Sequence, residues 1–437
     1  MNIPKDNNRY PLAITKEYLV PKYLSFTHEL KDSYKRLVLE LLLLLNIDCS
    51  KKRKLQQRHL ESKLRTLELV IVNLINKTRL DTNQQVFISY RAQAFTDTHC
   101  SYRQFVSVMN TLENSGLIIR EKGKKQTCPF DNKIWFYYSA SLITITPKFI
   151  NLCCCIQINK LNFESFSSVC LPKYFVSARY ASNLVRGKKY RGKKIEIRKL
   201  KVTPEFHILN NQMKKINDFI EKQSIKNAEF YGLVRSFNFI DNFHYFNYGG
   251  RMQAVGNKNF QTLKKEERKK ILINGEAVSE VDIKASHLSI FYGILGKQIK
   301  NEDPYKVNGL HRDIVKEWVN ISLSNSKYCE RWPVNTKIRL LEKGHDLKKL
   351  SAKNAGKIIL ETITILKYLK NHTAGWGFLQ YAESCILVKT IIELNNLNIA
   401  ALPVHDSLIV QQNHAVITKQ ILSDVFFKQF NTRPRLD

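Results

Sequence analysis

The chain has 437 residues, and its 70 Lys and Arg outnumber its 38 Asp and Glu, which gives a formal net charge of +32 at pH 7. A hydrophobic fraction of 43% supports packed cores, so the composition excludes a wholly disordered chain. Such an excess of basic residues favours a polyanionic partner, because Lys and Arg gain affinity by releasing counterions from phosphates. Nucleic acid is the first candidate partner, and an anionic membrane surface is the alternative.

Membrane insertion and secretion are not expected. The longest apolar run, at 37–47, is shorter than the roughly 20 residues of a spanning helix and contains Glu40. The N-terminus "MNIPKDNNRYPLAI" lacks the apolar segment of a signal peptide. The nine cysteines form no C-x-x-C pair and no set with zinc-ligand spacing. We therefore expect a soluble cytoplasmic protein with reduced, mostly buried thiols.

The first 150 residues predict a helix-rich, basic region. Apolar residues recur at intervals of three and four over 28–47 and again over 55–78, which is the pattern of amphipathic helices. A basic polar stretch separates the two predicted helices.

Residues 86–147 predict a compact unit that can read DNA. We expect a short helix, a turn, a second amphipathic helix ending at Ser115-Gly116, a strand over 117–123 and a returning strand over 133–147. This is the order of a winged helix, in which the second helix enters the major groove. An ordinary α+β scaffold is the alternative. Basic side chains favour the first interpretation: Arg91, Arg103, Arg120, Lys122, Lys124 and Lys125.

The densest basic run, "RGKKYRGKKIEIRKLK" at 186–201, lies in a region (151–240) that we expect to be a basic linker or thumb-like segment. Gly187 and Gly192 indicate a flexible or hairpin insert. The repeated R-G-K-K unit favours contact with a nucleic-acid backbone over a merely solvated face. The candidate nucleic-acid contacts are Arg186, Lys188, Lys189, Arg191, Lys193 and Lys194.

Two aspartates stand at the ends of apolar strands. "AVSEVDI" reads as a strand that ends at Asp282, just before a helical segment, and "ALPVHDSLIV" reads as a tight hairpin with His405 and Asp406 at its tip. A carboxylate on an apolar hairpin needs a compensating cation. Two such aspartates are the minimum for two-metal phosphoryl transfer, with the backbone carbonyl of Ile283 as a further ligand. Two Mg²⁺ ions are expected, and Mn²⁺ is an alternative.

The segment 309–327 has helical periodicity and carries polar side chains at steps of four: Arg312, Lys316, Asn320 and Ser324. Arg binds phosphate through two parallel hydrogen bonds and Lys binds it as a point charge, so this stripe is suited to a triphosphate. An ordinary solvated helix face is the alternative.

Together these motifs resemble the family A DNA polymerases and the related single-subunit RNA polymerases, over roughly residues 230–437. Asp282, followed five residues later by His287, resembles the first catalytic motif, in which the later position discriminates the sugar. Arg312 and Lys316 match the R-x3-K of the fingers helix. "VHDS" at 404–407 resembles the final V-H-D-E hairpin.

Further positions match the nucleic-acid contacts of that family. Arg251 and Gln261, in "YGGRMQAVGNKNFQTL", stand where the family touches the primer–template minor groove. Gln380 stands where the family keeps a template-contacting Gln. The sequence around these motifs most resembles that of compact polymerase-like proteins of bacteria and mobile elements.

The resemblance implies an α+β fold with a right-hand polymerase palm and reduced fingers at 241–437. It implies a template-directed nucleotidyltransferase, a DNA polymerase that uses nucleoside triphosphates on primed or single-stranded DNA and serves replication of a mobile element. Asp282 and Asp406 would hold the metal ions, and Arg312, Lys316 and Asn320 the incoming nucleotide. His287 would lie beneath the sugar, and His405 against the primer backbone.

Two alternatives stay open: an RNA polymerase or primase on the same fold, and a DNA-binding replication initiator with a degenerate palm. The chain departs from the family at four positions: His287 replaces the Glu of DNA polymerases, Asn320 an aromatic residue, Ser324 a Tyr and Ser407 a Glu. These departures leave the choice of sugar open. No protein partner is implied.

Overall fold

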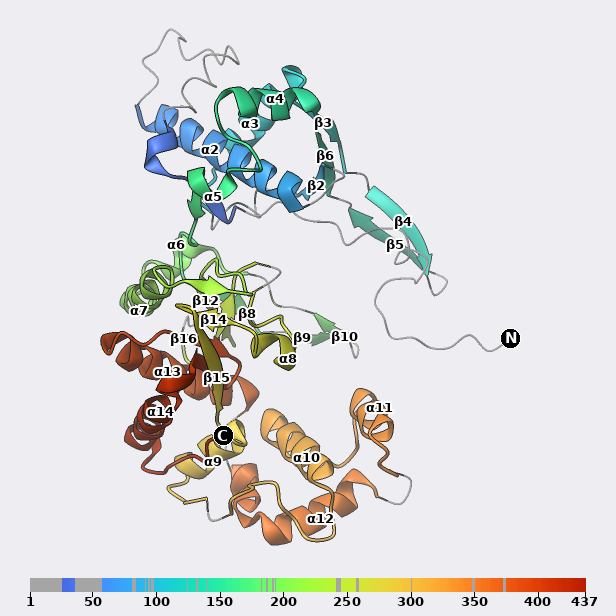
Figure 1. The fold of residues 1–437 in the computed structure, drawn as a ribbon. Helices are drawn as coiled ribbons and strands as arrows, with labels where there is room; N and C mark the ends of the chain where they lie inside the picture. Colours follow the sequence, from blue (N-terminus) through green and yellow to red (C-terminus); the bar gives the residue numbers. More distant parts are fainter. Residues whose placement is uncertain are drawn as a thin grey trace. The chain divides into compact units, whose positions relative to one another are not determined.

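The chain divides into two compact units, residues 1–173 and 174–437, each with helices and open sheets, so the protein is of the α+β class (Figure 1). The computed structural model describes residues 26–35, 57–80, 84–90, 92, 95, 98–123, 125–130, 133–138, 140–181, 183–185, 188–190, 192, 194–240, 245–256, 259–299, 301–347, 350–371 and 375–437.

The first unit contains a three-stranded antiparallel sheet in the order β2-β6-β3 and two strand pairs, β1-β7 and β4-β5. Its strands are β1 (His28–Leu30), β2 (Gln85–Ile88), β3 (Ile118–Glu121), β4 (Lys125–Phe130), β5 (Lys133–Tyr138), β6 (Ser141–Ile145) and β7 (Ser167–Val169). Its helices are η2 (Asp32–Tyr34), α2 (Gln57–Leu80), α3 (Tyr102–Asn114), α4 (Pro147–Cys155) and α5 (Phe163–Phe166).

Helix α3 follows its sequence pattern closely. Phe105, Val108, Met109 and Leu112 recur at helical spacing and are buried in the core of the unit. After the helix, Gly116 adopts a left-handed φ of 67°, which ends the helix and turns the chain into β3. The predicted second helix and its end at Ser115-Gly116 are confirmed.

Two other local predictions in this unit are wrong. Residues 28–30 form strand β1 instead of the start of a helix, because they pair with β7 (His28 opposite Val169). Residues 86–88, expected to begin a short helix, belong to β2, which pairs with β6 (Val86 opposite Ile143). In both segments, pairing with a strand distant in sequence overrides the local periodicity. The apolar run at 37–47 lies outside the described residues.

The second unit is built on a five-stranded sheet, β11-β14-β15-β17-β16, and a three-stranded sheet, β13-β12-β8. Its strands are β8 (Val176–Tyr180), β9 (Asn183–Val185), β10 (Lys188–Tyr190), β11 (Ile225–Lys226), β12 (Leu233–Phe239), β13 (Gly249–Ala254), β14 (Leu272–Ile273), β15 (Glu276–Asp282), β16 (Ala401–Val404) and β17 (Ser407–Gln411). Its helices are α6 (Ile197–Leu200), α7 (Pro204–Ile220), α8 (Lys265–Arg268), α9 (Ser286–Ile294), α10 (Arg312–Asn325), α11 (Val334–Glu342), α12 (Ala352–Thr362), η4 (Thr364–Asn371), α13 (Trp376–Asn396), η5 (Gln412–His414) and α14 (Ala415–Phe430).

The β16–β17 hairpin lies at one edge of the five-stranded sheet, and all residues of its two strands are buried, as expected of a hairpin covered on both faces. Helix α13 contacts β13, β16, α9 and α14, and α14 also contacts β15 and β17. The ends of β15 and of the β16–β17 hairpin are therefore fixed by well-packed elements.

The unit boundary differs from the three regions expected from the sequence. Residues 151–173 belong to the first unit, whereas β8, α7 and β12 are integral parts of the second. The basic run contributes one strand, β10, to a hairpin whose other strand, β9, precedes the run; Lys188 is opposite Val185.

The predictions about membranes and thiols have separate outcomes. Within the described residues, no helix is both long and apolar enough to cross a bilayer. Buried thiols are confirmed at Cys100, Cys153, Cys170 and Cys329. The prediction is wrong for Cys154 and Cys155, which are exposed at the end of α4.

Candidate active site

Asp282 and Asp406 lie together at one end of two paired central strands. Asp282 is the last residue of β15 and is directly opposite Ser407, the first residue of β17. The backbone N–H of Ile283 approaches the carbonyl oxygen of Asp406 at 3.5 Å. The strand register thus brings the two aspartates, far apart in sequence, to the same edge of the sheet.

Strained backbone lies directly before Asp406 and three residues after Asp282. His405, the first residue of the two-residue turn between β16 and β17, has φ 56°, and Ala285, between β15 and α9, has φ 52°. Residues with a Cβ atom rarely adopt this left-handed conformation, which costs on the order of 1 kcal/mol or more. Such strain is concentrated at functional sites, where the surrounding packing maintains it.

The two carboxyl groups are half-buried and repel each other. Burial, and after it the negative charges of Asp406, Asp437 and Glu280, together raise the pKa of Asp282 from 3.8 to about 7. Burial also raises the pKa of Asp406, with Glu383 as the next cause. A pair of carboxylates in this arrangement favours either a proton or a bound cation.

The last residues of the chain run beside Asp282. Ile283 forms an antiparallel bridge with Leu436, and the N–H of Asp437 donates to the carbonyl oxygen of Asp282 at 3.0 Å. The Lys284 ammonium lies 2.7 Å from a carboxylate oxygen of Asp437. The flanking hydrogen bond thus uses the carbonyl of Asp282, whereas the predicted extra ligand was the carbonyl of Ile283.

Among the residues that the structure describes, Lys316 on α10 supplies a positive charge that lowers the pKa of the Asp282 carboxyl group. Lys316 is exposed, so it can also reach a ligand. This proximity joins the helix predicted to bind the triphosphate to the aspartate pair.

Arg312 and Asn320 are held by a loop that the sequence analysis did not single out. Arg312 Nε lies 2.8 Å from a carboxylate oxygen of Asp303, and its guanidinium lies 5.4 Å from the centre of the Tyr305 ring. The Tyr305 hydroxyl donates to Asn320 Oδ1 at 3.2 Å. Tyr305 is buried, and the motif "DPY" at 303–305 is the signal that could have identified this contact.

A second group missed from the sequence is Glu383 on α13, which is only 2% exposed. Its carboxylate accepts a hydrogen bond from Arg251 at 2.7 Å and another from the Ser286 hydroxyl at 2.8 Å. His287 Nε2 lies 3.5 Å from the same carboxylate. Glu383 therefore connects two predicted site residues, Arg251 and His287, from the helix on which the sequence singled out only Gln380.

Burial leaves two nitrogen atoms of this group without a hydrogen-bond partner, Arg251 Nε and His287 Nε2. Burial also lowers the pKa of His287, and the charge of Glu383 opposes that effect. Buried polar atoms are normally hydrogen-bonded, so Arg251 Nε is the atom of this group that could still donate to an acceptor, whereas His287 Nε2 faces the Glu383 carboxylate at 3.5 Å.

Ser407, where the resembled family has Glu, belongs to a separate polar network. Its hydroxyl donates to Glu280 at 2.6 Å, and the Arg268 guanidinium binds both oxygens of the same carboxylate at about 3.0 Å. Glu280 is on β15, two residues before Asp282 and hence on the same face of the strand. A carboxylate is therefore present beside position 407, but it belongs to Glu280 of β15.

The remaining predicted contacts lie in different environments. The Gln261 side chain accepts from the N–H of Ala254 at 2.9 Å and donates to the carbonyl of Pro403 at 2.7 Å, so it fastens β13 to β16. Gln380 is partly exposed on α13, and His405 is exposed at the hairpin tip. Gln261 is therefore a positioning residue, whereas the other two side chains can reach a ligand.

The structure describes three of the six candidate contacts in the basic run. Lys188 and Lys189 are in β10. Lys194 is exposed, and its backbone forms an antiparallel β-bridge with that of Arg179. Arg186, Arg191 and Lys193 lie outside the described residues.

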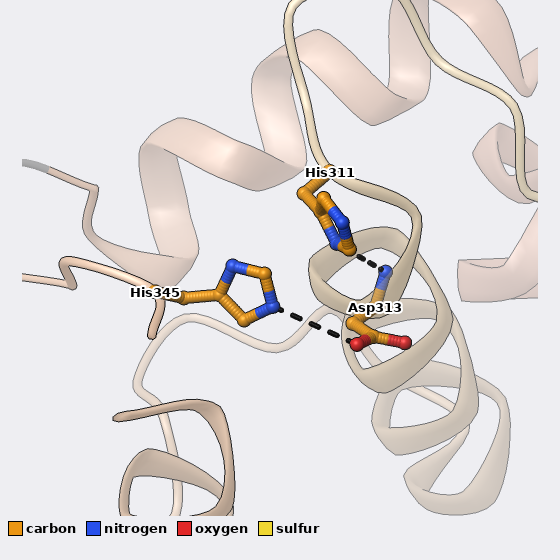
Figure 2. A group of neighbouring side chains, drawn as sticks. All are labelled: His311, Asp313 and His345. Atoms are coloured by element: carbon orange, nitrogen blue, oxygen red, sulfur yellow. Dashed lines mark hydrogen bonds and ion pairs between the residues drawn. The ribbon is translucent and has the colours of Figure 1, made fainter. Parts of the chain in front are cut away.

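A separate group of potential ligands, His311, Asp313 and His345, has its nitrogen and oxygen atoms within 4.8 Å of one another (Figure 2). Its imidazoles do not suit Mg²⁺, which prefers oxygen ligands. His311 caps α10 by accepting from the N–H of Asp313 at 3.3 Å, and the Asp313 carboxylate lies 3.1 Å from the Lys343 ammonium. These contacts explain the group as a helix cap and ion pair.

No protein-family model matches the chain, and a search of curated proteins finds no similar sequence.

Proposed function

We propose that the second unit catalyses template-directed nucleotidyl transfer and that the chain is a DNA polymerase with a palm and reduced fingers. The observation that carries this proposal is the pair Asp282 and Asp406 at the shared end of β15 and β17, with Lys316 of α10 beside it. Paired carboxylates that can hold metal ions, next to a cation that can bind phosphate, are the minimal set of groups for phosphoryl transfer.

The side chains present fit a pair of divalent cations. Asp282 and Asp406 offer hard oxygen ligands, and their mutual repulsion would be relieved by positive charge. When bound, Mg²⁺ or Mn²⁺ would activate the attacking oxygen and neutralise charge on the phosphorus. Both aspartates would hold the ions, and the Ile283 carbonyl is a candidate additional ligand.

The other residues have roles that follow from their chemistry. Lys316 would bind the triphosphate as a point charge, and Arg312 would bind it through its guanidinium after exchanging Asp303 for phosphate. Asn320 would steady the same helix face. His287, backed by Glu383, would form the floor beneath the sugar.

The nucleic acid would lie across the same surface. Arg251, held by Glu383, would contact the primer end, and His405 and Gln380 would contact the primer backbone and the template. Gln261 would maintain the spacing of β13 and β16 beneath them. The net charge of +32 supports DNA as the partner.

Primer extension tests this proposal. The full-length protein is incubated with a primed DNA template, Mg²⁺ or Mn²⁺, and either deoxyribonucleotides or ribonucleotides, beside Asp406→Asn. We expect extension with deoxyribonucleotides that the variant lacks. Preference for ribonucleotides would change the assignment to an RNA polymerase or primase. If wild type and variant both fail to extend and bind DNA equally, a degenerate palm in a DNA-binding initiator replaces the enzyme.

A further inference from the structure

Helix α3 of the first unit has a continuous polar face that the proposed polymerase reaction does not use. Its apolar face is buried, whereas four residues on the opposite side are exposed. These four residues, here called the α3 stripe, are Arg103, Ser107, Asn110 and Asn114. Their spacing of four, three and four residues places them in one line along the helix.

The chemistry of the α3 stripe matches the edges of DNA bases. A guanidinium pairs with the O6 and N7 acceptors of guanine, and a carboxamide pairs with N6 and N7 of adenine. A hydroxyl can donate to or accept from either. The face has the hydrogen-bonding character of a base-reading helix, whereas a helix that docks on another protein normally presents apolar anchors.

Arg120 on the neighbouring strand β3 contacts two side chains of α3. Arg120 on β3 donates to Asn110 Oδ1 at 3.0 Å and forms an ion pair with Glu113. The ion pair neutralises an acidic side chain that would repel phosphate. The contact to Asn110 also fixes the plane of its amide, and the Nδ2 group and a second lone pair on Oδ1 remain for a base.

One basic side chain lies at the C-terminal end of α3, and another follows β3, the strand that contacts this helix through Arg120. Lys148, at the start of α4, donates to the carbonyl oxygen of Ser115 just beyond the end of α3, at 2.9 Å. Lys122 is exposed directly after β3. Cations at the edges of a polar helix suit the phosphates that border a groove.

The α3 stripe suits duplex DNA better than duplex RNA. The major groove of B-form DNA is about 12 Å wide and admits an α-helix, whereas the major groove of A-form RNA is too narrow for side chains to read. We propose that the α3 stripe enters the major groove of duplex DNA and selects its sequence. This gives the chain a second function, the choice of a site, which templated synthesis by base pairing does not supply.

Selection from a pool of randomised DNA duplexes tests the proposal. Full-length Asp406→Asn protein is used, so that bound DNA is not extended. We expect an enriched sequence, with Arg103→Ala and Asn110→Ala each losing preference at one or two base pairs by about tenfold. Lys160→Ala, which removes one exposed charge from the same unit, should enrich the original sequence.

The outcomes separate this proposal from the polymerase proposal. An enriched sequence that depends on Arg103 supports it even if no extension is ever observed. Failure of the Asp406→Asn protein to enrich any sequence, or the same enrichment by both α3 variants in that background, overturns it even if the wild-type protein extends primers robustly. Thermal unfolding of Arg103→Ala should match the wild type, because the side chain is exposed and outside the core.

Discussion

One group of charged side chains in each unit shows the contrast between paired and like charges. In the first unit, Arg65 of α2 forms ion pairs with Glu29 and Glu68, and Glu68 also accepts from the N–H of Leu30 at 3.0 Å. In the second unit, Asp282 and Asp406 are held together with like charge. Opposite charges fasten β1 to α2, whereas like charges cost stability and persist where a ligand can compensate them.

The largest effect should come from breaking the like-charge pair. Asp282→Asn removes a proposed metal ligand and should reduce the proposed nucleotidyl transfer by at least about a thousandfold. The same change removes repulsion, so the free energy of unfolding of the metal-free protein at pH 8 should stay equal or rise. Primer extension and denaturant unfolding measure the two quantities. A clear loss of stability would show that Asp282 is a structural residue.

Breaking the opposite-charge cluster should have the converse result. Arg65→Ala leaves Glu68, which is 6% exposed, without its cation and should lower the free energy of unfolding by about 3 kcal/mol. Lys214→Ala is the matched control, because it removes an exposed pair with Asp218 and should cost about 0.5 kcal/mol or less. Urea unfolding of both variants measures the difference. Equal losses would mean that burial does not strengthen the first cluster.

Glu383→Gln sharpens the comparison within the second unit, because it keeps the size of a buried side chain and removes its charge. Arg251 and His287 would lose their carboxylate partner, and we expect about a tenfold fall in kcat/KM for nucleotide. Glu383 raises the pKa of Asp406 and opposes the lowering of the His287 pKa, so both pKa values should fall. A pH–rate profile shifted to lower pH separates this role from a purely structural one, which would leave the profile in place.

The smallest effect concerns pH and metal. Because the pKa of Asp282 is about 7 in the folded chain and 3.8 ordinarily, the folded state binds more protons between these values. The contribution of Asp282 to the free energy of unfolding therefore falls as pH rises from 4 through 7. We expect Mg²⁺ to raise the melting temperature at pH 8 by a few degrees, and less at pH 6.

Asp282→Asn is the control for that measurement, since its side chain does not titrate. Its melting temperature should respond less to pH and little to Mg²⁺. An equal Mg²⁺ response in wild type and variant would place the ion elsewhere on the chain.

Several parts of the candidate site could be read from the sequence because they depend on short windows. The strand ending at Asp282, the tight turn at His405-Asp406 and the helical stripe of Arg312 and Lys316 are encoded by alternation, turn position and a four-residue step. Helix α3 is predictable for the same reason, including its end at Gly116.

Other contacts could not be read in this way. Glu383 lies in the middle of a helix that is apolar on most sides, so no period marks it as a partner of Arg251. Gln261 has the position of a nucleic-acid contact but is bound to backbone groups of β13 and β16. Residues 28–30 have helical periodicity and still form a strand, because β7 supplies the hydrogen bonds.

The sequence by itself determined the α+β class, the excess of basic charge and the local elements that carry Asp282, Asp406 and Lys316. Only the tertiary structure decided that β15 and β17 pair with Asp282 opposite Ser407, that Glu383 connects Arg251 to His287, and that Asp303 holds Arg312. The physical reason is range: turn propensity and periodicity act over a few residues, whereas register and charge pairing depend on segments that meet only after the chain has folded.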